Sequence, residues 1–147
     1  IPAVVKVDRS TGATVWTMGP TDDLTHPVSS EEPFDVTHQT SVLSPDEFLL
    51  FVNMTEESEC ARVARVSVSP SDSAAESEWI YGEDECLTVF GLGGVSRLGN
   101  GNTQVIWSTA GRLEEYGSEG QLLRRIENNF GYAFGYGHHV DSLYTPW

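Results

Sequence analysis

An internal repeat of β-hairpins constrains the fold of this chain more than any other feature of its sequence. Residues 35–53 contain two runs of strand-favouring residues separated by the turn sequence Ser44-Pro45-Asp46-Glu47, in which proline presets the backbone for a tight turn. Residues 95–107 have the same plan around an Asn-Gly turn, a strong signal for a short hairpin. Aligning Leu43 with Leu98 brings the two turns and the second strands into register without a gap.

A second type of hairpin recurs three times, at residues 4–16, 62–81 and 112–124, each with a tip rich in Ser, Gly, Asp or Pro. Four strands per unit, repeating at roughly 50 residues, are typical of the blade of a β-propeller. We therefore expect one all-β portion of a propeller with about two and a half four-stranded antiparallel blades. Its parts are the closing hairpin of a blade (1–19), two full blades (38–82 and 93–127) and a tail rich in Gly and aromatic residues (128–147).

The hairpin count also predicts that other blades complete the ring. Known propellers close with about 4–8 blades, and an open arc leaves strand edges that other chains can pair with. We expect the chain to be the C-terminal part of a longer protein. The partner is then either a set of blades upstream or a self-association partner.

The composition limits the classes of partner. The net charge is −14, with only 8 Lys and Arg residues, which opposes binding to nucleic acid or to an anionic membrane surface. No apolar run is long enough for a membrane span. The simplest interpretation of the negative charge is that it keeps the protein surface well solvated and has no specific function.

Two cysteines, Cys60 and Cys86, lie at the loop edges of one repeat unit. An even count is compatible with one disulfide and an oxidising compartment, or with two free core thiols. The sequence leaves this choice open.

Three residues stand out as site candidates. His38 begins a strand, where the other full unit has Gly93, so the fold does not demand histidine there and a catalytic role competes with that of an ordinary loop histidine. Arg97 replaces Val42 of the first unit, and is a candidate for substrate binding or for a surface ion pair. Asn53 is a candidate for substrate binding or for a turn cap. We expect no metal site, because neighbouring histidines such as His138 and His139 point to opposite faces of a strand.

Seven segments of the chain carry a resemblance to a known family: residues 7–19, 34–53, 61–66, 79–82, 97–103, 111–113 and 141–144. In this order, they resemble the bacterial aryl-sulfate sulfotransferases that work without a nucleotide sulfate donor. The resemblance covers nearly the whole chain. The chain departs from the family in reading Thr37-His38-Gln39 where Gln-His-Asp is common, so the flanking carboxylate is absent.

The resemblance implies a six-bladed propeller in the periplasm or outside the cell, with no cofactor. It implies transfer of a sulfuryl group from an aromatic sulfate to a phenol, through a sulfohistidine on His38. Other residues of the family site would lie upstream, so we expect this chain alone to be inactive. The alternative is a non-catalytic propeller that serves as a binding or scaffold module.

Overall fold

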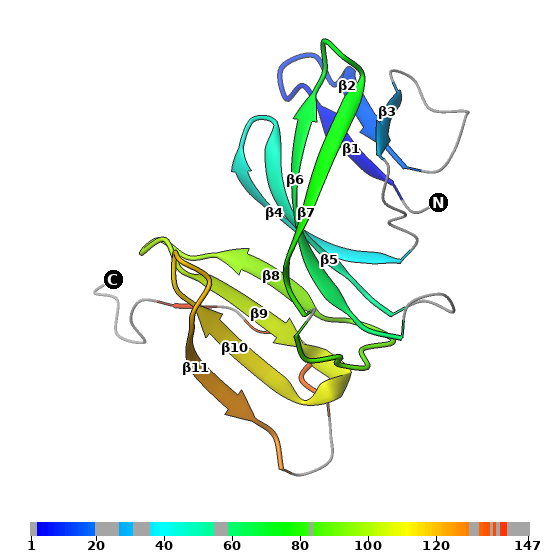
Figure 1. The fold of residues 1–147 in the computed structure, drawn as a ribbon. Helices are drawn as coiled ribbons and strands as arrows, with labels where there is room; N and C mark the ends of the chain where they lie inside the picture. The colour runs from blue at the N-terminus through cyan, green and yellow to red at the C-terminus, as the bar shows by residue number, and fades with distance from the viewer. Residues whose placement is uncertain are drawn as a thin grey trace.

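The computed structural model describes residues 3–19, 27–30, 36–54, 59–82, 84–129, 133–135, 137 and 139–140. This part of the chain is all-β, as predicted, and its one helical element is the 3-10 turn η1 (Ser108–Ala110) (Figure 1). The strands are β1 (Val4–Val7), β2 (Thr14–Met18), β3 (Pro27–Ser30), β4 (Thr37–Ser44), β5 (Glu47–Val52), β6 (Arg62–Ser69), β7 (Ala74–Tyr81), β8 (Gly94–Arg97), β9 (Thr103–Trp107), β10 (Arg112–Tyr116) and β11 (Leu122–Glu127).

Two four-stranded antiparallel meanders form most of the structure. The first meander is β4 to β7 and the second is β8 to β11, and in each the strands pair in chain order. The hairpin β1–β2 lies at the top of Figure 1, the first meander in the middle and the second meander at the bottom. No closed sheet is formed by these strands, and β1 and β4 are the two edges of the larger sheet.

The strand β3 lies within the polar connector of residues 20–32, where no strand is expected from the sequence. It pairs in parallel with β2 through Pro27 and Val28, and with β7 through Ser29 and Ser30. It thereby supplies backbone partners to two strands that would otherwise end the sheet. The rest of that connector lies outside the described residues.

The Asn100-Gly101 turn expected from the sequence forms between β8 and β9, as a three-residue loop. The Leu98 N–H donates to Asn102 O at 2.8 Å, and the Gly101 N–H donates to Leu98 O at 3.0 Å. Gly101 has φ 86°, which is the left-handed position that closes a three-residue hairpin loop.

The strand β5 lies at the centre of the packing because both of its faces are buried. Phe48 and Leu50 face a core shared with Trp16 of β2. Leu49 and Phe51 face a second core between the two meanders. This explains the uninterrupted apolar run of β5, since a strand buried on both faces does not alternate in polarity.

The two cysteines form a disulfide, Cys60–Cys86, whose Cα atoms are 4.8 Å apart. Next to it, the Ala61 N–H donates to Leu87 O at 2.9 Å and closes an isolated β-bridge. Together they fix the connector between β7 and β8 to the start of β6.

The described residues of the tail pack on the second meander. The Phe134 N–H donates to Ser108 O at 3.1 Å, and Gly137 lies so close to Ile106 that an added Cβ would be 2.7 Å from its side chain. The remainder of the predicted tail, including His138 and residues 141–147, lies outside the described residues.

Candidate functional site

His38 lies at an irregularity near the start of β4. Thr37 pairs with Val52 and Gln39 pairs with Phe51, so His38 is an extra residue with no partner across the β4–β5 ladder. This is the arrangement of a β-bulge, which turns a side chain away from the regular alternation of a strand and is frequent beside active sites. The His38 side chain is exposed and is not committed to either core.

An open pocket of about 380 Å³ surrounds His38 between β4 and the start of β1. Thr37 and Thr40 contribute hydroxyl groups, and Leu50 and Gln39 also line the pocket, with the Gln39 side-chain amide lying close to Gly94 of the second meander. Its other lining residues are Ala3, Val4 and Val5. Among the described residues, neither a basic nor an acidic side chain lines this pocket. The site therefore offers one imidazole and several neutral hydrogen-bonding groups.

The structure explains why the second meander has glycine at the position equivalent to His38. Gly93 has φ 92°, and a Cβ at this residue would lie 2.4 Å from the Phe51 ring. Any larger residue would clash with the core between the meanders. His38 has no such restriction, which is consistent with a position that is free to carry chemistry.

Arg97 makes hydrogen bonds to β4 and within its own hairpin. Its backbone N–H donates to Ser41 Oγ at 3.0 Å, and one guanidinium nitrogen donates to Gly101 O at 2.6 Å. Arg97 does not line the pocket that contains His38.

Asn53 is a buried residue that organises a connector. Its Nδ2 donates to Val89 O at 3.1 Å and to Leu92 O at 2.9 Å, and its backbone N–H donates to Val36 O at 2.9 Å. Leu92 has φ 59°, a conformation that is costly for a residue with a side chain. The structure thus places Asn53 in a positioning role for residues 89–92, and does not bring it together with His38.

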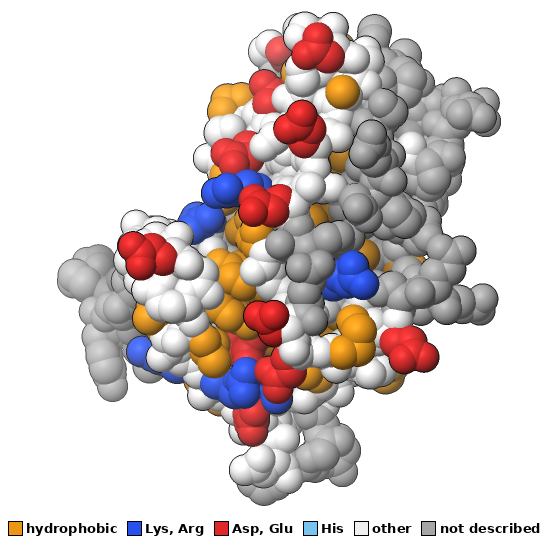
Figure 2. Space-filling view, in the orientation of Figure 1, with side chains coloured by type: hydrophobic (Ala, Val, Ile, Leu, Met, Phe, Trp, Pro, Cys, Tyr) orange, Lys and Arg blue, Asp and Glu red, His pale blue; other side chains and the backbone are white. Residues whose placement is uncertain are grey.

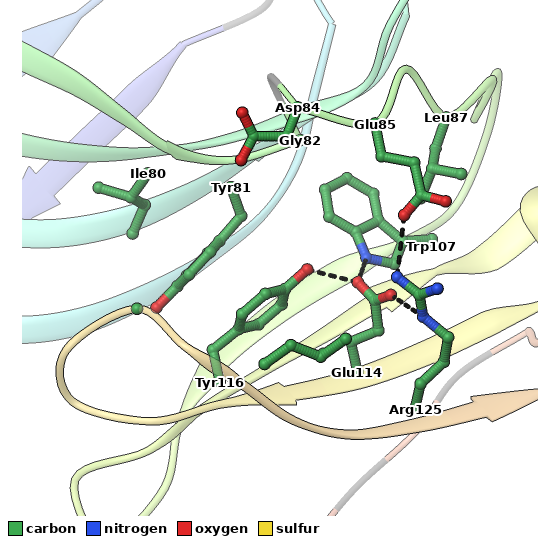
Figure 3. Close-up of a pocket in the computed structure, with 12 residues that line it drawn as sticks. Ile80, Tyr81, Gly82, Asp84, Glu85, Leu87, Trp107, Glu114, Tyr116 and Arg125 are labelled. Atoms are coloured by element: carbon green, nitrogen blue, oxygen red, sulfur yellow. Dashed lines mark hydrogen bonds and ion pairs between the residues drawn. The ribbon is translucent and has the colours of Figure 1, made fainter.

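Sequence reasoning missed a buried charged network centred on Glu114. This carboxylate is 1% exposed, and it accepts hydrogen bonds from Trp107 Nε1 at 2.6 Å, from the Tyr116 hydroxyl at 2.5 Å and from Arg125 Nε at 2.6 Å (Figure 3). Burial and the adjacent Glu114 carboxylate raise the pKa of the Tyr116 hydroxyl, so it remains a donor. With donors from β9, β10 and β11 on its two oxygens, Glu114 joins these three strands.

Residues of the same network line a pocket of about 260 Å³ between the second meander and the connector that joins β7 to β8. Glu85 of the connector lies 2.7 Å from an Arg112 nitrogen and 2.9 Å from an Arg125 nitrogen, and the hydrogen bond from Arg112 is the main cause that lowers the pKa of Glu85. The Tyr81 and Tyr116 rings stack with centroids 4.0 Å apart. One feature of the internal repeat pointed to this network. By the strand pairings, Glu114 occupies the position that Ala64 has in the first meander.

The surface charge reflects the acidic composition of the chain. Figure 2 shows Asp and Glu side chains spread over this face, with the basic side chains in separate small patches rather than a continuous stripe. Within the described ranges, no group of three or more His, Cys, Asp or Glu residues is placed to hold a metal ion. In the same ranges, no helix has the length and apolar character needed to cross a membrane.

Comparison with known proteins adds no assignment. No protein-family model matches the chain, and no curated protein matches it.

Proposed function

We propose that this chain is part of a β-propeller of the aryl-sulfate sulfotransferase type, in which His38 accepts the sulfuryl group. The observation that carries the proposal is the position of His38. It is an exposed residue at an irregularity of β4, at the head of an open pocket. A nucleophile must be accessible to its substrate, and His38 meets this condition because its side chain is exposed and lines the pocket.

The arrangement of the sheets supports the propeller part of the proposal. Both meanders run in chain order from a first strand to a fourth, they pack face to face through a shared core, and their first strands β4 and β8 lie against each other. Neighbouring four-stranded blades of a propeller pack against each other in this way.

The proposed reaction has two steps with balanced bonds. The lone pair of the neutral His38 imidazole forms an N–S bond while the S–O bond to the donor phenol breaks, and the released phenolate takes up a proton. An acceptor phenol then loses its proton as its oxygen attacks sulfur and the N–S bond breaks, which restores the neutral imidazole. Covalent catalysis of this kind divides one difficult transfer into two easier ones. Thr37 and Thr40 are the residues with hydroxyl groups that line this pocket for the sulfate oxygens.

The substitution His38→Ala tests this function in the protein at its native length. We expect release of phenol from 4-nitrophenyl sulfate in the presence of a phenol acceptor to fall to the uncatalysed rate, with folding unchanged by circular dichroism. His139→Ala is the matched control and should retain the activity. Equal rates in the two variants, or no release by the folded unsubstituted protein, would reject His38 as the nucleophile.

A non-catalytic binding module is the second candidate. It is favoured by the lack of a basic side chain among the described residues lining the His38 pocket, since a transferring sulfuryl group needs compensation of its charge. If the folded native-length protein binds aryl anions without any turnover, this second function is the better account.

We also propose a periplasmic or extracellular location. The Cys60–Cys86 disulfide supports it, because disulfides persist in oxidising compartments. The proposed location is tested by the redox state of these two cysteines in protein isolated under thiol-trapping conditions. Free thiols in the native protein would oppose the location.

A further inference from the structure

The pocket of about 260 Å³ beside the Glu114 network lies between two meanders that both belong to this chain. We call it the inter-meander pocket. One wall is the end of β7 with the connector at residues 82–87, and the other wall is built from β9, β10 and β11. Further blades of a ring would pack on the outer sides of these two meanders, so they would leave the inter-meander pocket open to a ligand.

The connector wall of the inter-meander pocket is fixed in place. The Cys60–Cys86 disulfide joins the connector to the segment before β6. Glu85 reaches from the connector to the second meander, where it lies 2.7 Å from an Arg112 nitrogen and 2.9 Å from an Arg125 nitrogen. A pocket held in this way does not have to be ordered by its ligand, which favours binding.

Half of the inter-meander pocket is apolar. Its aromatic and aliphatic lining residues are Ile80, Tyr81, Leu87, Trp107, Tyr116 and Leu122. Leu122 is 44% exposed, so part of this lining is in contact with water. The volume is close to the lower end of the range for small-molecule pockets, whose walls are mostly apolar. The pocket therefore suits a ligand with one ring or a short apolar chain.

Most of the polar groups in the inter-meander pocket are already used within the protein. Glu114 accepts three hydrogen bonds, and Glu85 is paired with Arg112 and Arg125. Asp84 is different, because no residue in the described part of the chain forms a hydrogen bond or an ion pair with its carboxylate. Figure 3 shows this carboxylate apart from the chain of contacts that runs through Glu85, Arg125 and Glu114.

The charges decide which kind of ligand can use Asp84. The pocket is lined by the carboxylates of Asp84, Glu85 and Glu114 and by one guanidinium, that of Arg125, and the whole chain has a net charge of −14. An anion is repelled, whereas an ammonium group donates charge-assisted hydrogen bonds to a carboxylate. Within the described ranges these acidic residues are not placed to hold a metal ion, which favours an organic cation.

We propose that the inter-meander pocket binds a small organic ammonium ion that carries one ring or a short apolar chain. Its ammonium group pairs with Asp84, and its apolar part lies against Tyr81, Tyr116 and Leu122. This site is separate from the pocket at His38, with which it shares no lining residue. The inference does not rest on the proposed sulfuryl transfer.

Three probes that share a phenylethyl group test the charge preference in the native-length protein. They are 2-phenylethylammonium, the neutral 2-phenylethanol and the anionic 3-phenylpropanoate. By isothermal titration calorimetry we expect the ammonium ion to bind about tenfold tighter than the alcohol, because it alone pairs with a carboxylate. The propanoate should bind most weakly. Added NaCl should reduce the advantage of the ammonium ion, since salt screens the interaction between partly exposed charges.

The substitution Asp84→Asn tests the charged end of the site. It should weaken 2-phenylethylammonium binding by about tenfold and leave 2-phenylethanol binding unchanged, because the alcohol does not depend on the charge. Asp72→Asn is the matched control. Asp72 is an exposed aspartate at the turn between β6 and β7 and does not line the pocket, so this variant makes the same change in net charge and should bind both probes normally.

The substitution Leu122→Ala tests the apolar end of the site. It should weaken binding of both 2-phenylethylammonium and 2-phenylethanol by about threefold, because it removes apolar surface that the ring covers. Leu123→Ala is the matched control, since Leu123 is the next residue of the same strand, is 54% exposed and does not line the pocket. Both leucines are exposed on the edge strand β11, so both variants should fold.

The outcomes separate this site from the His38 pocket. Equal affinities for the ammonium ion and the alcohol, or equal effects of Asp84→Asn and Asp72→Asn, would overturn the inference. Selective loss of ammonium binding in Asp84→Asn would support it. His38→Ala should leave 2-phenylethylammonium binding unchanged, and loss of binding in that variant would place the probe at His38 and reject the inter-meander pocket as its site.

Discussion

Lys6 Nζ donates a hydrogen bond to Asp46 Oδ1 at 2.7 Å, and this contact joins β1 to the turn between β4 and β5. It spans two strands that are not paired with each other. The same Asp46 oxygen accepts a hydrogen bond from Trp16 Nε1 at 3.3 Å. These contacts hold the hairpin β1–β2 against the first meander.

The Lys6–Asp46 pair should make a small, pH-dependent contribution to stability. The hydrogen bond from Lys6 is the main cause that lowers the pKa of Asp46 below its ordinary value of 3.8. The stabilisation is therefore present above that ordinary value and lost as the pH falls through the lowered pKa. Because both side chains are partly exposed, we expect Lys6→Met to cost only about 0.5 kcal/mol at neutral pH.

Urea denaturation of Lys6→Met and the unsubstituted protein checks this at neutral pH and again well below the ordinary aspartate pKa. The difference in unfolding free energy should shrink in acid. A difference that stays constant with pH would mean that Lys6 acts through its packing on Trp16 and not through the ion pair.

The Glu114 network should contribute far more to stability than any surface ion pair. Glu114→Ala leaves Trp107 Nε1, the Tyr116 hydroxyl and Arg125 without their common acceptor, and removal of one partner of a buried charged network costs about 3–5 kcal/mol. Glu114→Gln keeps the shape and part of the hydrogen bonding, so its cost should be smaller. Thermal unfolding of both variants measures the effect. The control is Glu119→Gln at an exposed turn position, which should be nearly neutral, and equal stabilities for Glu114→Ala and this control would contradict the network.

The disulfide should stabilise the chain by constraining its unfolded state. The sequence separation of Cys60 and Cys86 is 26, and a loop of this length corresponds to about 3.5 kcal/mol in the chain-entropy estimate. We expect a reductant to lower the urea midpoint of the unsubstituted protein and to have no effect on a Cys60→Ser/Cys86→Ser double variant. If the reductant leaves the unsubstituted protein unchanged, the disulfide contributes little to its stability.

The affinity for anionic aryl ligands should rise with salt. The net charge of −14 repels an anion from a distance, and mobile ions screen this repulsion over about 10 Å at 0.1 M salt. Titrations of biphenyl-4-sulfonate at increasing NaCl concentration measure the trend. A fall in affinity with salt would show that local positive charge dominates the site, contrary to the neutral lining described for the His38 pocket.

Local patterns in the sequence were sufficient to predict the hairpins. The Pro45-Asp46 turn and the apolar run of β5 both form as expected, because turn chemistry and strand propensity act over a few neighbouring residues. The strand β3 was missed because its parallel partners β2 and β7 are distant in sequence. Its short polar sequence becomes a strand only where two unpaired edges meet it.

The site depended more strongly on tertiary structure. The sequence singled out His38, but the irregularity that exposes it arises from a register shift between two strands, which no local pattern encodes. Glu114 looked like one more acidic residue, since its donors come from three different strands. Asn53 was singled out as a candidate for substrate binding or for a turn cap, whereas its hydrogen bonds to Val89 and Leu92 give it a structural role in a connector distant in sequence.

The central claim is that His38 carries the sulfuryl group, and trapping of that intermediate tests it most directly. The native-length protein would be mixed with an aryl sulfate in the absence of an acceptor, quenched rapidly, digested at alkaline pH and analysed by tandem mass spectrometry. The account predicts a sulfuryl adduct on the imidazole of His38 that disappears when a phenol is added before quenching. An adduct on another residue, or phenol release without an adduct at His38, would contradict it.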